Sequence, residues 1–236
     1  IVCIVRELRC ENPLLNLKLL GERNFGVSMA VLAIFGIGML GGTYLLPLYM
    51  QKGLGYTAIM AGSVFLPVGL IQGVLSTCSG FLTRYIKPLF IAVTGILVMT
   101  LSFYFASRFT LHTTHAQIML VLYLRGFGMG LTFAPLNDFS LMNLSQRDMA
   151  SAAGISNSIK QLSGSVSIAL LTVILTGRTA FHSAQGGLSS AESYVAGISD
   201  DFLFVTFVSL ASALPFLWLL RPRRKAASFK SEGTGT

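Results

Sequence analysis

The sequence contains six long apolar runs, and their length constrains the fold more than any other feature. A helix that crosses the hydrocarbon core of a bilayer needs roughly 20 apolar residues. Short connections rich in glycine, proline or charged residues separate the runs. The runs predict six membrane-spanning helices, over residues 25–50, 57–82, 88–106, 116–135, 153–176 and 202–220.

The low content of charged residues supports a membrane protein. They make up 11% of the 236 residues, against about 25% in an ordinary soluble domain. A soluble domain of this size must still cover a large surface with polar groups. The predicted fold is an all-α membrane protein with a six-helix bundle over 25–220. Residues 1–24 are expected to be the end of a preceding helix and a cytoplasmic linker, and 221–236 a basic cytoplasmic tail.

The distribution of lysine and arginine predicts the orientation, because cytoplasmic loops carry an excess of both. With the N-terminus in the cytoplasm, twelve of the seventeen fall on the cytoplasmic side and three on the outer side. Both termini are therefore expected in the cytoplasm. The net charge of +8 comes from short clusters between apolar runs, which fits anionic lipid at a membrane surface better than nucleic acid.

Arg125 lies inside the predicted fourth span, about 14 Å from its start at 1.5 Å per residue. A cation at such a depth costs about 2.5–3.5 kcal/mol even on the mild insertion scale, so a compensating contact is expected. Thr132 follows Arg125 at helical spacing. One interpretation places both residues on a substrate path. The other makes Arg125 a structural residue bonded to carbonyl groups of a neighbouring helix.

A polar seam is predicted in the fifth span. Asn157, Lys160, Gln161 and Gly164 recur at spacings of three and four, which puts them on one face of a helix that is otherwise apolar. Lys160 is close enough to the cytoplasmic end for its ammonium group to reach the interface. The seam either lines an internal aqueous path or holds neighbouring helices together.

Small residues indicate where helices approach closely, because lipid offers no hydrophobic drive for helix association. Gly38 and Gly42 form a GxxxG pair in the first span, and Gly126 and Gly130 form another in the fourth. With Gly164 they are candidates for helix packing. The motif is common in membrane proteins and says little about function by itself.

Catalytic and metal-binding patterns are not found in the sequence. The histidines are expected in outer loops, and no metal-ligand spacing, nucleophile motif or nucleotide fingerprint occurs. Asp200 and Asp201 end a segment, 177–201, that is expected to be an exposed and poorly ordered loop. Without a carboxylate near mid-membrane, this chain is not expected to carry a proton relay. An enzyme and a bound cofactor are therefore not expected.

Four segments together resemble one transporter family. They are NPLLNLKLLGERNFGVSM (12–29), GGTYLLPLYMQKGLGYTAIMAGSVFLPVGL (41–70), LRGFGMGLTFAPL (124–136) and ASAAGISNSIKQLSGSVSIAL (150–170). They resemble parts of EmrB/QacA-type multidrug exporters, the fourteen-span branch of the major facilitator superfamily. In order, they are similar to the linker that leads into the ninth span, to the ninth and tenth spans, to the twelfth span and to the thirteenth span. The resemblance covers nearly the whole chain.

This resemblance implies a function for the whole protein. Such exporters, found in the bacterial inner membrane, exchange amphipathic or cationic compounds for protons by alternating access, and six-span halves enclose a cavity near the midplane. The chain would be the C-terminal half, working with an N-terminal half and, in some members, with a periplasmic adaptor. Arg125 and Lys160 align with positions that are usually basic in the family.

The resemblance is imperfect in one loop. The family's loop motif places an acid before an arginine, whereas SGFLTRYIK (79–87), which begins with Ser79 and Gly80, has Thr83 before Arg84. The charge contacts made by that motif are therefore in doubt for this half. An alternative interpretation is a membrane-embedded interaction subunit, or an inactive transporter fragment, without transport of its own. The sequence does not identify the substrate.

Overall fold

A computed structural model describes residues 17–141, 144–146, 148–184 and 189–215, and these residues form helices and connections without strands. Six helices of the described residues are long and apolar enough to cross a membrane, which confirms the predicted fold class. A short helix η1 (Leu17–Gly21) precedes them. The long helices are α2 (Arg23–Leu48), continued by a π turn η2 (Tyr49–Gly53), α3 (Ala58–Leu82), α4 (Pro88–Ala106), α5 (His115–Leu141), α6 (Met149–Ala184) and α7 (Ser190–Ala211).

The predicted helix boundaries are correct where the connections are short and wrong where they are long. Helix α4 covers the predicted residues, and α3 differs by one residue at its start. The expected loop 177–201 is instead helical over most of its length, because α6 runs to Ala184 and α7 begins at Ser190. The last predicted span therefore starts about three turns too late. The expected N-terminal linker up to residue 16 and the tail 221–236 lie outside the described residues.

Local chemistry explains where several helices begin. Thr57 caps α3 by accepting a hydrogen bond from the backbone N–H of Met60. Helix α4 starts at Pro88, whose missing N–H is harmless in the first turn. Ser189 and Glu192 form a reciprocal capping box at the start of α7, which fixes this helix well before its apolar run.

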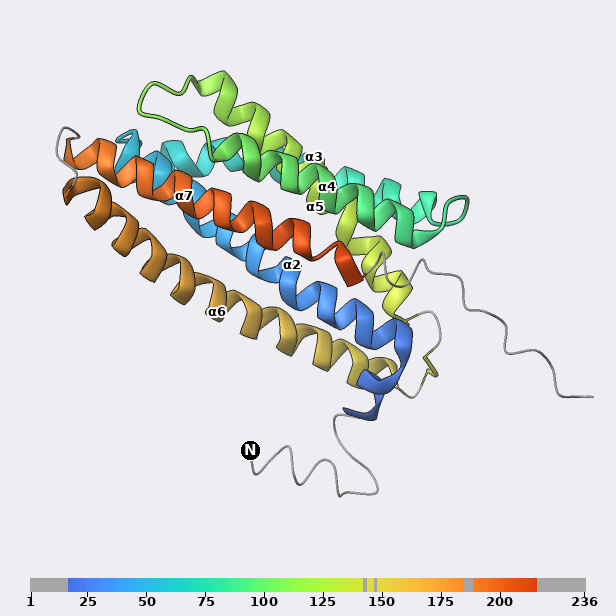
Figure 1. Cartoon of the computed structure of the whole chain (residues 1–236). Coiled ribbons are helices and arrows are strands. Elements are labelled where there is room, and N and C mark those ends of the chain that lie inside the picture. Colours follow the sequence, from blue (N-terminus) through green and yellow to red (C-terminus); the bar gives the residue numbers. More distant parts are fainter. Residues whose placement is uncertain (1–16, 142–143, 147, 185–188, 216–236) are drawn as a thin grey trace, which may run out of the picture.

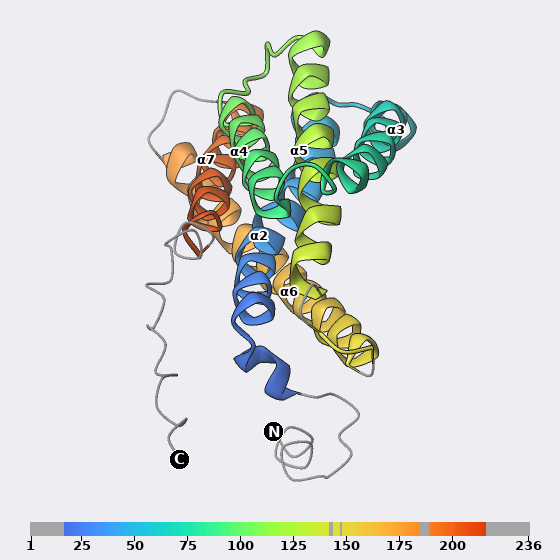
Figure 2. The same cartoon turned by 90° about the vertical axis from the view of Figure 1, so that its right-hand side faces the viewer.

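The helices pack as two neighbouring groups, which are joined by contacts of α4 with α7 and of α2 with α5. Helix α5 packs against both α3 and α4, whereas α2 packs against α6 and α7 (Figure 1). Helices α4 and α7 also contact each other, and α2 contacts α5. In the view of Figure 2, α5 and α2 lie between α3 on one side and α7 on the other.

We name the two ends of the bundle after their basic residues. The Lys52 end, on the left in Figure 1, carries the connections η2–α3, α4–α5 and α6–α7. The Arg84 end carries the start of α2 and the connections α3–α4 and α5–α6.

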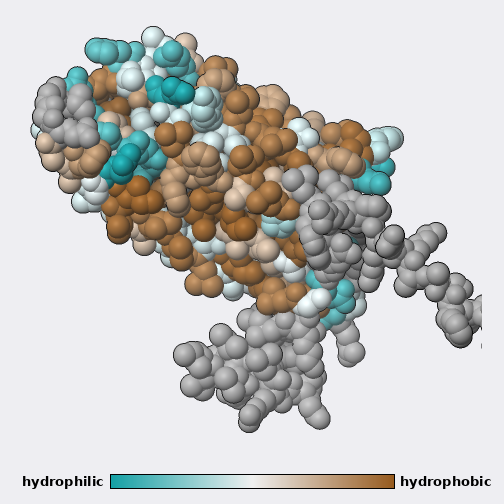
Figure 3. All heavy atoms as spheres, viewed as in Figure 1, coloured by the Kyte–Doolittle hydropathy of each residue, from teal (hydrophilic) through white to brown (hydrophobic). Residues whose placement is uncertain are grey.

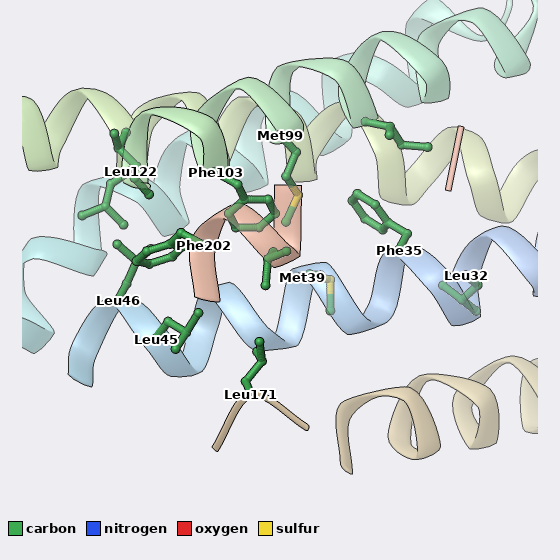
Figure 4. Close-up of a cluster of buried hydrophobic side chains, with 14 of the residues drawn as sticks. Leu32, Phe35, Met39, Leu45, Leu46, Met99, Phe103, Leu122, Leu171 and Phe202 are labelled. Atoms are coloured by element: carbon green, nitrogen blue, oxygen red, sulfur yellow. The ribbon is translucent and has the colours of Figure 1, made fainter. Parts of the chain in front are cut away.

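The apolar core lies where α2, α4, α5, α6 and α7 meet (Figure 4). Phe35 and Met39 of α2 face Met99 and Phe103 of α4, and Phe202 of α7 lies beside them (Figure 4). Phe103 and Phe202 are almost fully buried. Side chains of this size stabilise the bundle through close packing, since lipid is as apolar as the core itself.

The outer surface is apolar between polar ends, as a bilayer requires. Figure 3 shows a broad hydrophobic zone across the bundle with hydrophilic side chains gathered at its ends. Helices α3 and α6 are the least covered, with 17% and 28% of their most apolar windows buried. Leu66, Leu70, Leu162 and Val166 are among their exposed side chains. These two helices therefore leave apolar surface for lipid or for another bundle.

Candidate translocation site

Arg125 crosses from α5 to α2 in the interior of the bundle. Its side chain is 3% exposed. One terminal guanidinium nitrogen donates to the carbonyl oxygen of Met39 at 3.2 Å and to the hydroxyl oxygen of Thr43. The Nε atom has no hydrogen-bond partner among the described residues. Among the described residues, the cation is thus held by α2, and its Nε–H has no acceptor.

The turn of α2 beside this cation is rich in oxygen atoms. Pro47 lies one turn after Thr43 and has no N–H, so the carbonyl of Thr43 loses its usual helical partner, although Arg125 donates to the Met39 carbonyl and the Thr43 hydroxyl instead. The π turn η2 follows directly. Thr43 also donates to the carbonyl of Met39. The oxygen-rich turn from Met39 to Thr43 offsets part of the cost of the buried cation.

Thr132, predicted to share a face with Arg125, lies against α4. It is fully buried and donates to the carbonyl of Gly128 at 2.7 Å. A Cβ placed on Gly95 would come within 2.4 Å of the Thr132 hydroxyl and 2.8 Å of the Gly128 carbonyl. Thr132 therefore sits in a tight α4–α5 contact. Gly95, whose lack of a side chain permits this contact, was not recognised in the sequence because it stands alone.

The predicted polar seam on α6 divides into a packed part and an exposed part. Gly164 is buried against Leu40 of α2, where a Cβ would lie 2.4 Å from a leucine methyl group. Lys160 is half-buried, with its ammonium nitrogen 5.0 Å from the centre of the Phe133 ring on α5. Asn157 and Gln161 are exposed on this bundle. The exposed amides have hydrogen-bonding capacity that the six helices do not use internally.

Lys160 and Arg125 lie at different depths along α5. Lys160 contacts Phe133, which is eight residues along α5 from Arg125, or about 12 Å of rise. The structure therefore brings the two cations to the same group of helices but not into one binding site.

The remaining packing candidates lie at helix contacts. Gly42 faces Phe103 of α4, where a Cβ would lie 2.3 Å from the ring, and Gly38 faces both α4 and α7 less tightly. On α5, Gly130 lies against Leu75 and the backbone of α3, and Gly126 lies against Val68. The GxxxG pair on α2 thus packs against α4 and α7, whereas the pair on α5 packs against α3.

The loop motif at the Arg84 end has an acid supplied from another helix. Arg84 is exposed beside the ring of Phe81, and a Cβ on Gly80 would meet open space. Thr83 donates to the carbonyl of Gly80 at 2.7 Å and lies 3.4 Å from the carboxylate of Asp138, at the end of α5. Thr83, which stands where the family's motif has an acid, therefore lies beside the carboxylate of Asp138.

A second group of polar residues lies at the Lys52 end and was not predicted. Asp200 of α7 forms an ion pair with Arg178 at 2.7 Å and a hydrogen bond with His182 at 2.9 Å, and both partners belong to the part of α6 beyond the predicted span. Asp201, the next residue, is fully buried. The prediction that this segment is an exposed loop is wrong. The helical spacing of Ser193, Gly197 and Asp201 was the available signal.

Two cavities lie at this end of the bundle. One, of about 560 Å³, is lined by Arg108, His112, His182 and Asp200 among others. The other, of about 390 Å³, lies between α2, α6 and α7. None of the residues predicted as a substrate path lines either cavity.

Comparisons with known proteins agree with this architecture. The family model described as Major Facilitator Superfamily matches residues 5–168. An uncharacterized MFS-type transporter, YhcA of Bacillus subtilis, is 32% identical over 77% of this chain and 34% of its own length. The multidrug export protein EmrB of Haemophilus influenzae is 31% identical over 78% of this chain and 36% of its own length.

A further relative covers more of the chain. The lincomycin resistance protein LmrB of Listeria innocua is 26% identical over 92% of this chain and 47% of its own length. The chain thus spans between about a third and a half of the length of these relatives. With six helices long and apolar enough to cross a membrane, and a family match over residues 5–168, the chain belongs to the Major Facilitator Superfamily.

Proposed function

We propose that these six helices form the C-terminal half of a secondary active exporter, which moves amphipathic or cationic drug-like compounds out of the cell in exchange for protons. Relatives named for multidrug export and lincomycin resistance support this class of substrate. Alternating access would come from the rocking of this half against an N-terminal half around a central site.

The observation that carries the proposal is the buried bridge from Arg125 to α2. A packing role alone does not need a cation, because an apolar side chain would fill the same space without a desolvation cost. Among the described residues, the buried Nε of Arg125 has no acceptor. A shift of the helices during transport would let a substrate group, water in a central cavity or an acid of the other half accept that hydrogen bond.

The exposed faces of α3 and α6 support the pairing with a second bundle. Both helices expose long apolar side chains, and α6 also exposes Asn157 and Gln161. An amide facing acyl chains is unfavourable, whereas an amide facing an aqueous cavity between two halves is solvated. We therefore place Asn157, Lys160 and Gln161 on the wall of that cavity.

We further propose that the exporter lies in a bacterial inner membrane with both termini of this chain in the cytoplasm. The lysine and arginine distribution supports this orientation. The Lys52 end would then face outward, and its connections and cavities offer a surface on which a periplasmic adaptor can dock.

The proposal is tested by expressing the exporter that contains this chain in a bacterium lacking its main drug exporters. We expect lower ethidium accumulation and higher resistance than in the vector control, and loss of both effects when a protonophore collapses the proton gradient. Unchanged accumulation despite normal protein in the membrane would contradict export and favour an interaction subunit.

A further inference from the structure

Asp201 is the most deeply buried acid of the described chain, and nothing neutralises it. The residue is 0% exposed, and neither carboxylate oxygen has a hydrogen-bond partner. An ionised carboxylate in an apolar interior without donors is strongly disfavoured, whereas the neutral carboxylic acid is tolerated. The packing shown therefore suits the protonated form.

The cations near Asp201 are engaged elsewhere. On α6, Arg178 and His182 bind the neighbouring Asp200. On η2, Lys52 lies over the ring of Tyr194, which belongs to α7 itself.

The remaining titratable groups of the packed elements are likewise not bonded to Asp201. Among them, Tyr44 of α2 accepts a hydrogen bond from Thr172, Tyr49 of η2 donates to the carbonyl of Thr110, and Arg108 after α4 donates to the hydroxyl of Tyr104. Lys160 of α6 lies over the ring of Phe133, and His112 lines the 560 Å³ cavity. Among the described residues, no cationic side chain forms an ion pair with Asp201.

A buried hydroxyl group of α6 lies beside the turn of α7 that precedes Asp201. Gly197 precedes it by one helical turn, and a Cβ on Gly197 would lie 2.6 Å from the hydroxyl oxygen of Thr179. That hydroxyl is itself buried without a partner. Thr179 also lines the 390 Å³ cavity, together with Tyr44, Lys52, Thr172, Thr176 and Tyr194. Thr179 thus borders both this cavity and the turn of α7 that precedes Asp201.

A metal ion does not fit this position. Hard cations require several oxygen ligands, usually including more than one carboxylate. The described residues contain no group of three or more histidine, cysteine or acidic side chains that could hold a metal ion. A single proton needs only the one carboxylate.

We propose that Asp201 is a proton-binding site of this half, loaded and unloaded through the cavity at the Lys52 end. In the loading step, an O–H bond forms between a carboxylate oxygen and a proton delivered by hydronium, which becomes water. In the reverse step water takes the proton back, and no other bond changes. The packing of α7 on α6 seals the neutral acid, and a shift between these helices exposes the charged form to water. The role in coupling rests on the proposed function, but the binding of a proton does not.

The first test measures proton binding directly. Infrared difference spectra of the purified exporter between acidic and alkaline buffer should contain a carboxylic C=O band that disappears in Asp201→Asn and remains in Asp200→Asn. Asn has nearly the same shape as Asp and cannot release a proton. Asp200→Asn is the matched control, since it is the adjacent, more exposed acid with two partners. A difference spectrum of Asp201→Asn that keeps the band would overturn the inference.

The second test measures coupling in proteoliposomes. Asp201→Asn should lose at least tenfold in ethidium transport driven by a pH gradient, while ethidium exchange at equal pH stays within twofold of wild type. Asp200→Asn should retain gradient-driven transport. Full coupling in Asp201→Asn would contradict the role in coupling. If wild type moves no ethidium at all, the proposed function fails, and the infrared measurement still decides whether Asp201 binds a proton.

Discussion

The guanidinium of Arg125 on α5 donates to the carbonyl of Met39 on α2 at 3.2 Å, and its second acceptor is the hydroxyl of Thr43 one turn further along. This contact joins two helices that otherwise touch through few residues. The position of the cation therefore depends on α2, and a change in α2 alone should alter its environment.

Replacing the Thr43 hydroxyl by a methyl group tests that dependence. Thr43→Val keeps the side-chain shape but removes an acceptor from a buried cation, and hydrogen bonds to charged groups contribute about 1.5–3 kcal/mol. We expect a lower thermal unfolding midpoint in detergent. Thr94→Val is the control, because Thr94 on α4 is exposed like Thr43 but bonds only within its own helix. Equal midpoints for the two variants would show that the Thr43 contact contributes nothing.

A glycine substitution tests the α3–α5 contact. In Gly130→Ala the new Cβ would lie 2.7 Å from the Cβ of Leu75 and 3.0 Å from the carbonyl of Gln72. Overpacking of this kind typically costs about 1–3 kcal/mol. Gly73→Ala, on α3 with open space around it, should instead be neutral or stabilising, because alanine favours helix over glycine. Thermal unfolding of both variants decides between these results, and equal behaviour would contradict the close approach.

The sequence predicted the number of helices and most of their bounds, since the length of an apolar run follows directly from bilayer thickness. It failed for α7. The first turns of α7 are polar on one face, and the capping box at Ser189 and Glu192 and the buried side chains Val195 and Ile198 make them helical. Only the packing against α6 and η2 shows that this segment is structured.

The candidate site was predicted in part. The depth of Arg125 followed from helix rise, but its acceptors on α2 depend on how two helices cross, which a single sequence does not determine. Asp201 was assigned to a loop because hydropathy begins the span one residue later, at Phe202. Its burial comes from neighbouring helices and has no local signal beyond the spacing to Gly197.

The orientation of the bundle predicts which residues a membrane-impermeant reagent reaches. In a variant without the three native cysteines, a single cysteine at Ser189 should react from outside intact cells, and one at Tyr85 should react only after permeabilisation. Both positions are exposed and lie at opposite ends of the bundle. Labelling of Tyr85→Cys from outside, with protection of Ser189→Cys, would reverse the proposed orientation.

The central claim is that Arg125 serves transport and not merely packing. The most direct test compares ethidium export by Arg125→Ala and by Arg108→Ala, a control at an exposed arginine of the Lys52 end, at matched amounts of protein in the membrane. We predict that Arg125→Ala loses at least tenfold in export and that Arg125→Lys recovers only part of it, since a point charge does not replace a planar fork of donors. Arg108→Ala should export normally. Wild-type export by Arg125→Ala at normal membrane levels would contradict the account.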